Sequence, residues 1–471
     1  MQKFTTDVII GLEIHAELKT KTKLFCACPT QGSGEPNSRT CATCLGMPGS
    51  KPVLNRKAVE HALRVCLALD SGIAKEMVFS RKSYFYPDMS KNYQITQYEL
   101  PIGTGGSLKL ESGKTVSMKR VHLEEDPASL VHPAGVRESS YVLVDYNRSG
   151  QPLIEMVTEP EMHSPEEARD FLKQLITVLD YLGVFDSSAI IKADANVSIR
   201  ESHYTRVEIK NITGFKEIER ALGYEVARQR EEVREGKAVA QETRSWDSEK
   251  GATFSLRKKE TEDDYGYIID PDLVPITIDR EYVDGLRSSL PELAQDKLKK
   301  FRGQHGIEET TARVLAKDKA LAAMYEAVSG EVNPQLAANW VRRELPRVLN
   351  YYKKSLGESG ITPMHMISLL KLIEQKRITE KTGQRLIEKL GESAFDVEEY
   401  VTKEGLGVIS DSSLVEQWCR EAIKEAPGAA EEYRKGNEKS FNFLVGQVMR
   451  KAKGKADPQA VNGVLKGLLR R

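Results

Sequence analysis

The clearest structural signal in the chain is Val8–Leu18, which reads Val-Ile-Ile-Gly-Leu-Glu-Ile-His-Ala-Glu-Leu. From Leu12 onward apolar and polar residues alternate, and in a β-strand such alternation places the two kinds of side chain on opposite faces. Strict alternation is typical of a sheet that has one buried face and one open face. The open face of this strand would carry Glu13, His15 and Glu17.

Four later segments, residues 121–126, 153–157, 194–200 and 206–211, have a similar character. Like charges on adjacent strands repel one another unless a cation neutralises them. Carboxylates with one imidazole suit Mg²⁺ or Mn²⁺ better than Zn²⁺. We therefore expect a divalent cation on the open face. That face would gather Glu13, His15, Glu155, Asp194, Asn196 and either Glu124 or Glu125.

An ordinary polar face in contact with water is the alternative for any single segment. Glu155 is the exception, because an isolated acid between apolar neighbours needs a partner. Mg²⁺ held by carboxylates is the usual companion of a nucleoside triphosphate. The chain contains no G-x-x-x-x-G-K-[ST] motif, which excludes the P-loop class of enzymes.

Sequence signals for a helix appear within this strand-rich part, and further along the chain helical patterns take the place of strand patterns. Ser164 is placed as an N-cap, Pro165 as the first helical residue, Glu167 as the partner in a capping box and Gly183 as the stop. From about residue 291, helical patterns cover 310–328, 334–349, 362–374, 379–390 and 440–453, and another begins at residues 457–458. The layout predicts an α+β fold with three parts. These are a large sheet domain (1–292), a helical domain (293–398) and a small helical tail domain (399–471).

Composition narrows the class of protein. The 471 residues include 69 Lys+Arg and 69 Asp+Glu, so a chain wholly devoted to coating nucleic acid is excluded, although local basic patches are not. Hydrophobic residues make up 40% and charged residues 29%, as in soluble globular proteins. No apolar run approaches the ~18–20 residues of a membrane span, and the N-terminus has no signal-peptide pattern. We expect a cytoplasmic protein without membrane association.

Four of the six cysteines lie close together, as Cys26-x-Cys28 and Cys41-x-x-Cys44. Two short-spaced pairs on either side of a loop can offer four thiolates in a tetrahedron, so the loop 24–49 is predicted to hold a structural Zn²⁺. The alternative is four reduced cysteines without a metal. Cys66 falls in an apolar helical pattern and is expected in the core.

Two basic segments suggest contacts with phosphate. Residues 81–98 interleave three basic residues with five aromatic ones, which suits phosphate and base contacts, although an aromatic strand pair in the core is the alternative. From Lys439 to the C-terminus, eight basic side chains face one acid, Asp457. This tail could contact a nucleic-acid backbone, or it could be a solvated pair of basic helices. The tail residues of interest are Arg450, Lys451, Lys453 and Lys455.

Ten short motifs, spread in order over essentially the whole chain, resemble those of one family. They are Gly11–His15, Leu24–Cys28, Leu45–Gly49, Tyr84–Asp88, His122–Asp126, Val144–Arg148, Pro152–Glu155, Asp194–Ser198, Glu208–Asn211 and Phe443–Met449. The set resembles the B subunits of tRNA-dependent amidotransferases, the GatB family.

The resemblance implies a fold and a reaction. The large domain would be a cradle related to the glutamine synthetase fold, and it would bind the acceptor end of mischarged Glu-tRNA(Gln) or Asp-tRNA(Asn). ATP would phosphorylate the side-chain carboxylate of the attached amino acid, and ammonia would then displace phosphate. Ammonia would come from glutamine hydrolysed on a separate amidase, the A subunit, and the small C subunit would complete a heterotrimer, GatCAB.

The resemblance also implies roles for particular residues. The catalytic set would be Glu13, His15, Glu124, Glu125, Glu155 and Asp194, all but Glu124 also being Mg²⁺ ligands. Contacts to ATP or the acceptor end would come from Arg81, Lys82, Tyr84, Lys91, Asn147, Arg148, Asn196, Ser198 and Lys210. Zn²⁺ would be held by Cys26, Cys28, Cys41 and Cys44. The basic tail would bind the body of the tRNA.

Two positions depart from the family pattern, and two alternatives remain. Pro127-Ala128-Ser129 stands where the family has Ala-Gly-Lys, which removes a lysine expected to contact phosphate. Residues 264–270 lack the usual arginine and aromatic-proline pair. One alternative is an E-type subunit specific for Glu-tRNA(Gln), which carries an inserted domain for which this chain has little room. The other is a non-catalytic tRNA-binding scaffold, which need not keep the acids together.

Overall fold

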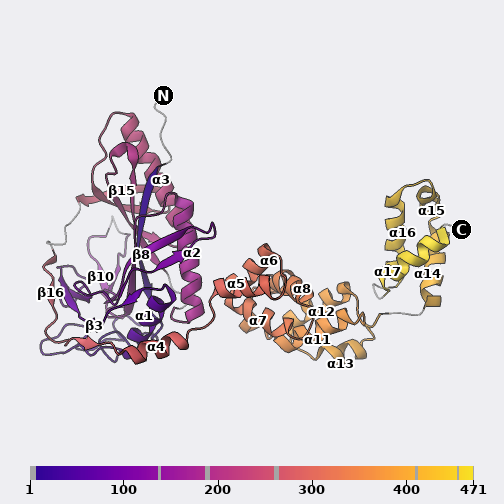
Figure 1. The fold of residues 1–471 in the computed structure, drawn as a ribbon, viewed down its shortest axis with the longest axis horizontal. Helices are drawn as coiled ribbons and strands as arrows, with labels where there is room; N and C mark the ends of the chain where they lie inside the picture. Colours follow the sequence, from indigo (N-terminus) through magenta and orange to yellow (C-terminus); the bar gives the residue numbers. More distant parts are fainter. Residues whose placement is uncertain are drawn as a thin grey trace. The chain divides into compact units, whose positions relative to one another are not determined.

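The computed structural model describes residues 7–135, 139–185, 191–258, 265–408, 412–452 and 456–469. The chain divides into two compact units, Met1–Leu293 and Ala294–Arg471. The first is built on a large sheet and the second is helical, so the predicted α+β class is confirmed (Figure 1). The finer division at residue 398 stays a prediction.

A ten-stranded sheet forms the centre of the first unit, with β1 between β12 and β11. Its order among the described residues is β15-β14-β13-β12-β1-β11-β8-β6-β2, with β7 paired to β8, and only β13 and β14 run parallel. The strands are β1 (Val8–Glu17), β2 (Gly72–Ile73), β6 (Gly103–Thr104), β7 (Ser107–Lys109), β8 (Thr115–Glu125), β11 (Pro152–Thr158), β12 (Lys192–Ile199), β13 (Val207–Thr213), β14 (Glu242–Asp247) and β15 (Ala252–Lys258).

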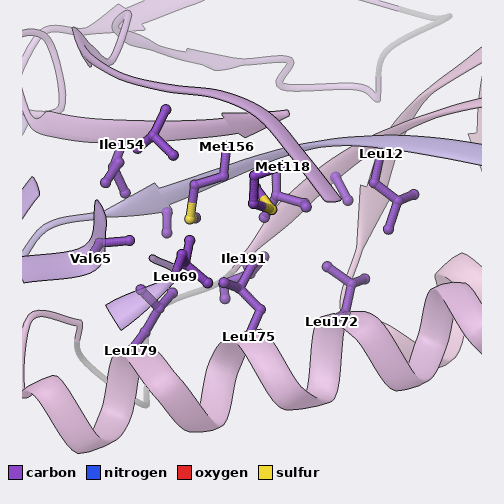
Figure 2. Close-up of a cluster of buried hydrophobic side chains, with 14 of the residues drawn as sticks. Leu12, Val65, Leu69, Met118, Ile154, Met156, Leu172, Leu175, Leu179 and Ile191 are labelled. Carbon is purple, nitrogen blue, oxygen red and sulfur yellow. The ribbon is translucent and has the colours of Figure 1, made fainter. Parts of the chain in front are cut away.

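Helices α1 (Arg56–Ala68), α2 (Pro165–Leu182) and α3 (Phe215–Arg234) pack on the sheet. Figure 2 shows Leu172, Leu175 and Leu179 of α2 facing Leu12 and Met156 of the sheet. Because neighbouring residues on a strand point to opposite faces, Glu13 and Glu155 project away from this core.

Helix α2 begins and ends as predicted. The Ser164 side chain accepts from the Glu167 N–H, Pro165 opens the helix, and Gly183 closes it with a left-handed φ of 66°. The capping box differs from the prediction by one residue, because the Glu167 carboxylate accepts from the N–H of His163 and not from that of the N-cap Ser164. The expectation for Cys66 is also confirmed, because this residue of α1 is fully buried.

Smaller groups of two or three strands lie outside the large sheet. One three-stranded sheet joins β16, β4 and β5, while β9 pairs with β10 and β3 pairs with β17. These are β3 (Glu76–Met77), β4 (Ser80–Ser83), β5 (Tyr93–Thr96), β9 (Ser129–Val131), β10 (Leu143–Asp145), β16 (Ile268–Ile269) and β17 (Ile276–Thr277), with the 3₁₀ turn η1 (Arg200–Ser202) and helix α4 (Arg280–Ser288). Strand β5 lies beside the end of β8, where the Gln94 amide donates to the Glu125 carbonyl over 2.7 Å.

The second unit is helical throughout its described part. Its first helices are α5 (Ala294–Gly303), α6 (Glu309–Lys317), α7 (Lys319–Ser329), α8 (Pro334–Asn339), α9 (Leu345–Tyr352), α10 (Leu356–Ser359), α11 (Pro363–Glu374), α12 (Glu380–Glu392) and α13 (Val397–Lys403). The pattern over 310–328 predicted one helix, but Asp318 ends α6 and caps α7 by accepting from the Leu321 N–H. The pattern over 334–349 is likewise interrupted by the π-helical turn η3 (Trp340–Glu344), which precedes Pro346.

The last helices form a cluster of their own, with Cys419, Leu444, Val448 and Leu465 in its core. They are α14 (Ser412–Glu425), α15 (Pro427–Arg434), α16 (Glu438–Lys451) and α17 (Pro458–Leu469). The predicted helices at 440–453 and from 457–458 correspond to α16 and α17. Among the described residues, no helix is long and apolar enough to cross a membrane.

Candidate functional site

Strand register brings a group of acids and histidines together on the open face of the sheet. His15 of β1 lies opposite Glu155 of β11, and Glu155 lies opposite His122 of β8. The His15 Nε2 is 3.4 Å from a Glu155 oxygen, 3.5 Å from a Glu124 oxygen and 3.8 Å from a Glu13 oxygen. We name this group the acidic centre; its members are Glu13, His15, His122, Glu124 and Glu155.

His122 is a member that sequence reasoning missed. Its Nε2 lies 3.2 Å from a Glu155 oxygen and 3.8 Å from a Glu124 oxygen, and the residue is buried. The signal was present, because His122 stands two residues before Glu124 and therefore shares its face of the strand. The same rule resolves the choice between Glu124 and Glu125 in favour of Glu124.

Burial and mutual charge shift the pKa values in the acidic centre. Burial first, and then the charge of Glu155, raises the pKa of Glu13 to about 7. Burial alone would lower the pKa of His15, but a hydrogen bond to Glu155 and the charge of Glu124 raise it to about 10. Burial would also lower the pKa of His122, but Glu155 and Glu124 raise it to about 9. Burial alone would raise the pKa of Glu155, but the charges of His122 and His15 and their hydrogen bonds hold it well below the usual range.

The acidic centre fits a hard divalent cation. Ligand atoms of Glu13, His15 and Glu155 lie within 4.8 Å of one another, and so do those of His122, Glu124 and Glu155. The Oε1 atom of Glu155 is buried and accepts no hydrogen bond in the described part of the chain, although the Arg120 guanidinium lies 3.6 Å from it. With their raised pKa values, His15 and His122 are protonated and balance the carboxylates when no metal is bound. A divalent cation would displace these protons, and oxygen with imidazole ligands suits Mg²⁺ or Mn²⁺.

Strands β12 and β13 supply the flank of the acidic centre. Asp194 lies opposite Glu13, and its carboxylate accepts from the Lys210 ammonium over 2.9 Å. The charges of Asp194 and Glu208 raise the pKa of Lys210 against the effect of burial. Asn196 lines the larger of two cavities described below, and its buried Oδ1 has no hydrogen-bond partner among the described residues. Ser198 is buried farther along β12 and lines neither cavity.

Two cavities share the acidic centre as a common wall. The larger, about 630 Å³, touches Glu13, His122, Glu124 and Glu155, and the smaller, about 320 Å³, touches Glu13, His15, Glu124 and Glu155. Basic and aromatic side chains complete the larger cavity: Lys82, Lys119, Arg120, Arg206, Lys210, Tyr98, Tyr265 and Tyr267. The smaller cavity also contains Lys82, Tyr84, Lys192, Asp194 and Lys210.

The stacking of two tyrosines in the larger cavity was not predicted from the sequence, although Tyr98 belongs to the segment 81–98 that was expected to contact phosphate and bases. The rings of Tyr98 and Tyr267 stack at 4.0 Å and 12°, and the Lys82 ammonium lies 4.7 Å above the Tyr265 ring. Tyr265 and Tyr267 belong to the segment that departs from the family pattern; Asp264, its first residue, lies outside the described residues. This segment forms part of the cavity wall.

Several predicted contact residues are used elsewhere in the protein. Arg81 pairs with Asp270 at 2.8 Å and with Asp272 at 3.1 Å. Arg148 donates to the carbonyls of Pro127 and Ala128 at 2.9 and 3.1 Å. Neither arginine lines either cavity, because their guanidinium groups hold loops together.

Glu125 and Lys91 also differ from their predicted roles. Glu125 does not join the acidic centre, because its carboxylate pairs with the Lys91 ammonium and accepts from the Ile95 N–H over 2.9 Å. Lys91 is thereby held in an ion pair, with 9% of its side chain exposed, and lines neither cavity. In the structure, the residue predicted as a Mg²⁺ ligand and the residue predicted as a phosphate contact form one internal pair.

The four cysteines come together as their spacing predicted. The sulfur atoms of Cys26, Cys28, Cys41 and Cys44 lie within 4.8 Å of one another. A hydrogen bond from Cys26 is the largest of the effects that lower the pKa of Cys44 to about 5, and burial raises that of Cys28 to about 11. Four sulfurs at this spacing suit Zn²⁺.

A buried lysine supports a thiolate character for this cluster. Lys23 is fully buried, and its ammonium lies 3.7 Å from the Cys44 sulfur and 3.1 Å from the Tyr146 carbonyl. No carboxylate pairs with Lys23 in the described ranges, so the sulfur is its available counter-charge. The same loop is anchored by Asn147, which accepts from the Arg39 N–H and donates to the Glu35 carbonyl, both over 2.7 Å. Asn147 therefore holds the cysteine loop and lines neither cavity.

The predicted tail residues are only partly described. Arg450 is exposed at the end of α16, while Lys451 pairs with Glu421 at 3.1 Å and Glu425 at 2.7 Å. Lys453 and Lys455 lie outside the described residues. Of these four tail residues, the described part of the chain therefore contains one exposed arginine and one paired lysine.

Comparison with known proteins agrees with the sequence motifs. Residues 8–284 match the GatB/GatE catalytic domain and residues 323–469 match the GatB domain. Similar proteins, named as the B subunit of aspartyl/glutamyl-tRNA(Asn/Gln) amidotransferase, occur in Carboxydothermus hydrogenoformans, 43% identical with 98% of each chain covered, and in Thermodesulfovibrio yellowstonii, 40% identical with 98% of this chain and 99% of the relative covered. A third, from Syntrophotalea carbinolica, is 41% identical with 98% of each chain covered. The chain therefore belongs to the GatB/GatE family, as its motifs predicted.

Proposed function

We propose that the first unit is the transamidating site of a tRNA-dependent amidotransferase acting on mischarged Glu-tRNA(Gln), Asp-tRNA(Asn) or both. The observation that carries the proposal is the acidic centre between two cavities, in a chain of this family. An oxygen of the aminoacyl carboxylate attacks the γ-phosphorus of ATP, and ADP leaves. Ammonia then attacks the acyl carbon, phosphate leaves, and a proton is lost to a base.

The acidic centre would hold Mg²⁺ through Glu13, His15 and Glu155, with His122 and Glu124 as a second set of ligands that shares Glu155. When bound, the cation would offset the charge of the phosphates and of the transferring phosphoryl group. Asp194 flanks these residues and is held by Lys210. The Asp194–Lys210 ion pair keeps one more carboxylate close to the acidic centre without adding net charge.

Charge distinguishes the two cavities. The larger offers Lys119, Arg120 and Arg206 beside stacked tyrosines, which suits a nucleoside triphosphate. The smaller, with Tyr84 and Lys192, suits the aminoacyl end of the tRNA. Lys82 and Lys210 line both and would contact phosphate where the two substrates meet.

Other parts of the chain would serve binding and assembly. The cysteine loop would hold a structural Zn²⁺, and the basic tail with Arg450 would contact the tRNA body. Ammonia would come from the amidase A subunit, joined with this chain and the small C subunit in a heterotrimer. Such an enzyme of tRNA charging would act in the cytoplasm.

The test uses the GatCAB heterotrimer with Mg²⁺, γ-labelled ATP and mischarged tRNA. Glu155→Gln and Asp194→Asn are expected to reduce tRNA-dependent ATP cleavage at least about 100-fold while tRNA affinity stays unchanged. Glu159→Gln, just beyond β11, is the matched control and should stay active. A fully active Glu155→Gln variant would remove the acidic centre from the reaction. Wild-type protein that binds tRNA without cleaving ATP would favour the scaffold.

A further inference from the structure

The two candidate metal sites of the first unit are joined by a short series of contacts through Lys91 and Glu125. We propose that the Lys91–Glu125 ion pair is a positioning pair: it fixes the end of β8 that carries Glu124 and His122, and the cysteine loop holds it in place. The proposal rests on the cation site proposed above. It assigns to the cysteine loop an effect on the acidic centre that requires no tRNA.

On the side of the acidic centre, the contacts of Glu125 leave it little freedom. Its carboxylate pairs with Lys91 and accepts from the Ile95 N–H at 2.9 Å, while its carbonyl accepts from Gln94 at 2.7 Å. Only 4% of its side chain is exposed. A charge so deeply buried requires its partner, and loss of that partner would be relieved by movement of the strand.

Glu124 is the residue through which such movement would reach the cation. It adjoins Glu125 in β8, and its Oε2 accepts from the Thr96 hydroxyl over 3.4 Å. Strand β5 therefore contacts both glutamates, through Ile95 and Thr96. Groups that orient metal ligands commonly change metal affinity by about 10- to 100-fold when removed.

On the side of the cysteine loop, the loop lies directly against Ser90 and Lys91. The Cys44 carbonyl accepts from the Ser90 hydroxyl at 2.9 Å and from the Ser149 hydroxyl at 3.3 Å. A Cβ atom on Gly46 would lie 2.6 Å from Cγ and 3.1 Å from Cα of Lys91. Gly46 thus permits the close approach that places the lysine stem.

The loop itself offers a matched pair of substitutions. Gly46 and Gly49 both have left-handed φ angles, 68° and 82°, but a Cβ on Gly49 would meet nothing within 4 Å. Alanine therefore adds similar backbone strain at both positions, and only at Gly46 does it collide with Lys91.

The experiment measures Mn²⁺ binding by electron paramagnetic resonance on the zinc-loaded, full-length chain without tRNA, with zinc content determined in parallel. Gly46→Ala and Lys91→Met should weaken Mn²⁺ binding about tenfold, and Gly49→Ala should leave it unchanged. Lys91→Arg, which keeps the charge, should recover most of the affinity. Zinc content should stay the same in the Lys91 variants, which leave the cysteines intact.

Unchanged Mn²⁺ affinity in both Gly46→Ala and Lys91→Met would overturn the proposal. If Gly46→Ala loses zinc, the result for Lys91→Met decides. If Lys91→Met also fails to fold, Lys91→Arg decides: its Mn²⁺ affinity must lie closer to that of the wild type than the Mn²⁺ affinity of Gly46→Ala does. Absence of any Mn²⁺ binding by the wild-type chain would instead contradict the proposed function, so the two failures are distinguishable.

Discussion

The acidic centre and the cysteine loop are built in opposite ways. The four cysteines lie within nineteen residues of one another along the chain, from Cys26 to Cys44, whereas the acidic centre gathers side chains from Glu13 to Glu155 out of three strands. A local loop needs only spacing to bring ligands together. A site on a sheet depends on strand order and register, so each of its residues is positioned by pairing with distant segments.

The two sites also balance their charges differently. In the cysteine loop, a single buried ammonium, Lys23, lies beside the Cys44 sulfur. In the acidic centre, two histidines, His15 and His122, each lie beside both Glu124 and Glu155 and balance their negative charge. Removing one group should therefore act locally in the loop and cooperatively in the acidic centre.

The largest effect is expected from Glu155→Gln, because Glu155 belongs to both ligand groups of the acidic centre. Mn²⁺ affinity, measured by electron paramagnetic resonance, should fall at least about 100-fold, while zinc content stays complete. Glu125→Gln should cost only about tenfold, since Glu125 supports the centre from outside. Equal losses in the two variants would restore Glu125 to the ligand set that the sequence predicted.

The next effect concerns the cysteine loop. Cys44→Ser should lower zinc affinity at least about 100-fold, as measured by competition with a chromophoric chelator, because it removes one of four thiolates and leaves Lys23 without a counter-charge. The exposed loop should then become sensitive to proteolysis between residues 30 and 40. Full zinc retention after Cys44→Ser would contradict a four-thiolate site.

Much of this architecture was predictable from local pattern. Alternation in β1, the caps of α2 and the spacing of the cysteines each depend on residues close in sequence, and all three agree with the structure. The breaks at Asp318 and before Pro346 were missed because apolar periodicity continues across them, while caps and backbone hydrogen bonds decide where a helix stops.

The acidic centre was only partly predictable. Alternation placed Glu13, His15, Glu155 and the flanking Asp194 on an open face, but it left the choice between Glu124 and Glu125 undecided. His122 was overlooked although it shares a face with Glu124. Ion pairing of Arg81 and Lys91 with distant acids could not be read from sequence, because it depends on how β4, β5 and β16 pair with one another and lie beside β8.

A smaller effect should follow from Lys23→Met, which keeps the aliphatic stem and removes the charge beside Cys44. Zinc affinity should fall about tenfold, since the ammonium would offset thiolate charge. Lys21→Met is the matched control: Lys21 is exposed two residues away, and its variant should bind zinc as the wild type does. Equal zinc affinity in both variants would show that Lys23 serves only the Tyr146 carbonyl.

The smallest effect is expected from Asn147→Ala, and it separates the sequence prediction from the structure most directly. The family resemblance placed Asn147 among the contacts to ATP or the acceptor end, whereas the structure shows it bonded to Arg39 and Glu35 of the cysteine loop. Loss of two hydrogen bonds should lower the free energy of unfolding by about 1–2 kcal/mol, measured by urea denaturation. The KM for ATP should stay within about twofold, because the side chain lines neither cavity. A tenfold rise in KM with unchanged stability would instead place Asn147 at the nucleotide, and would mean that the loop moves when ATP binds.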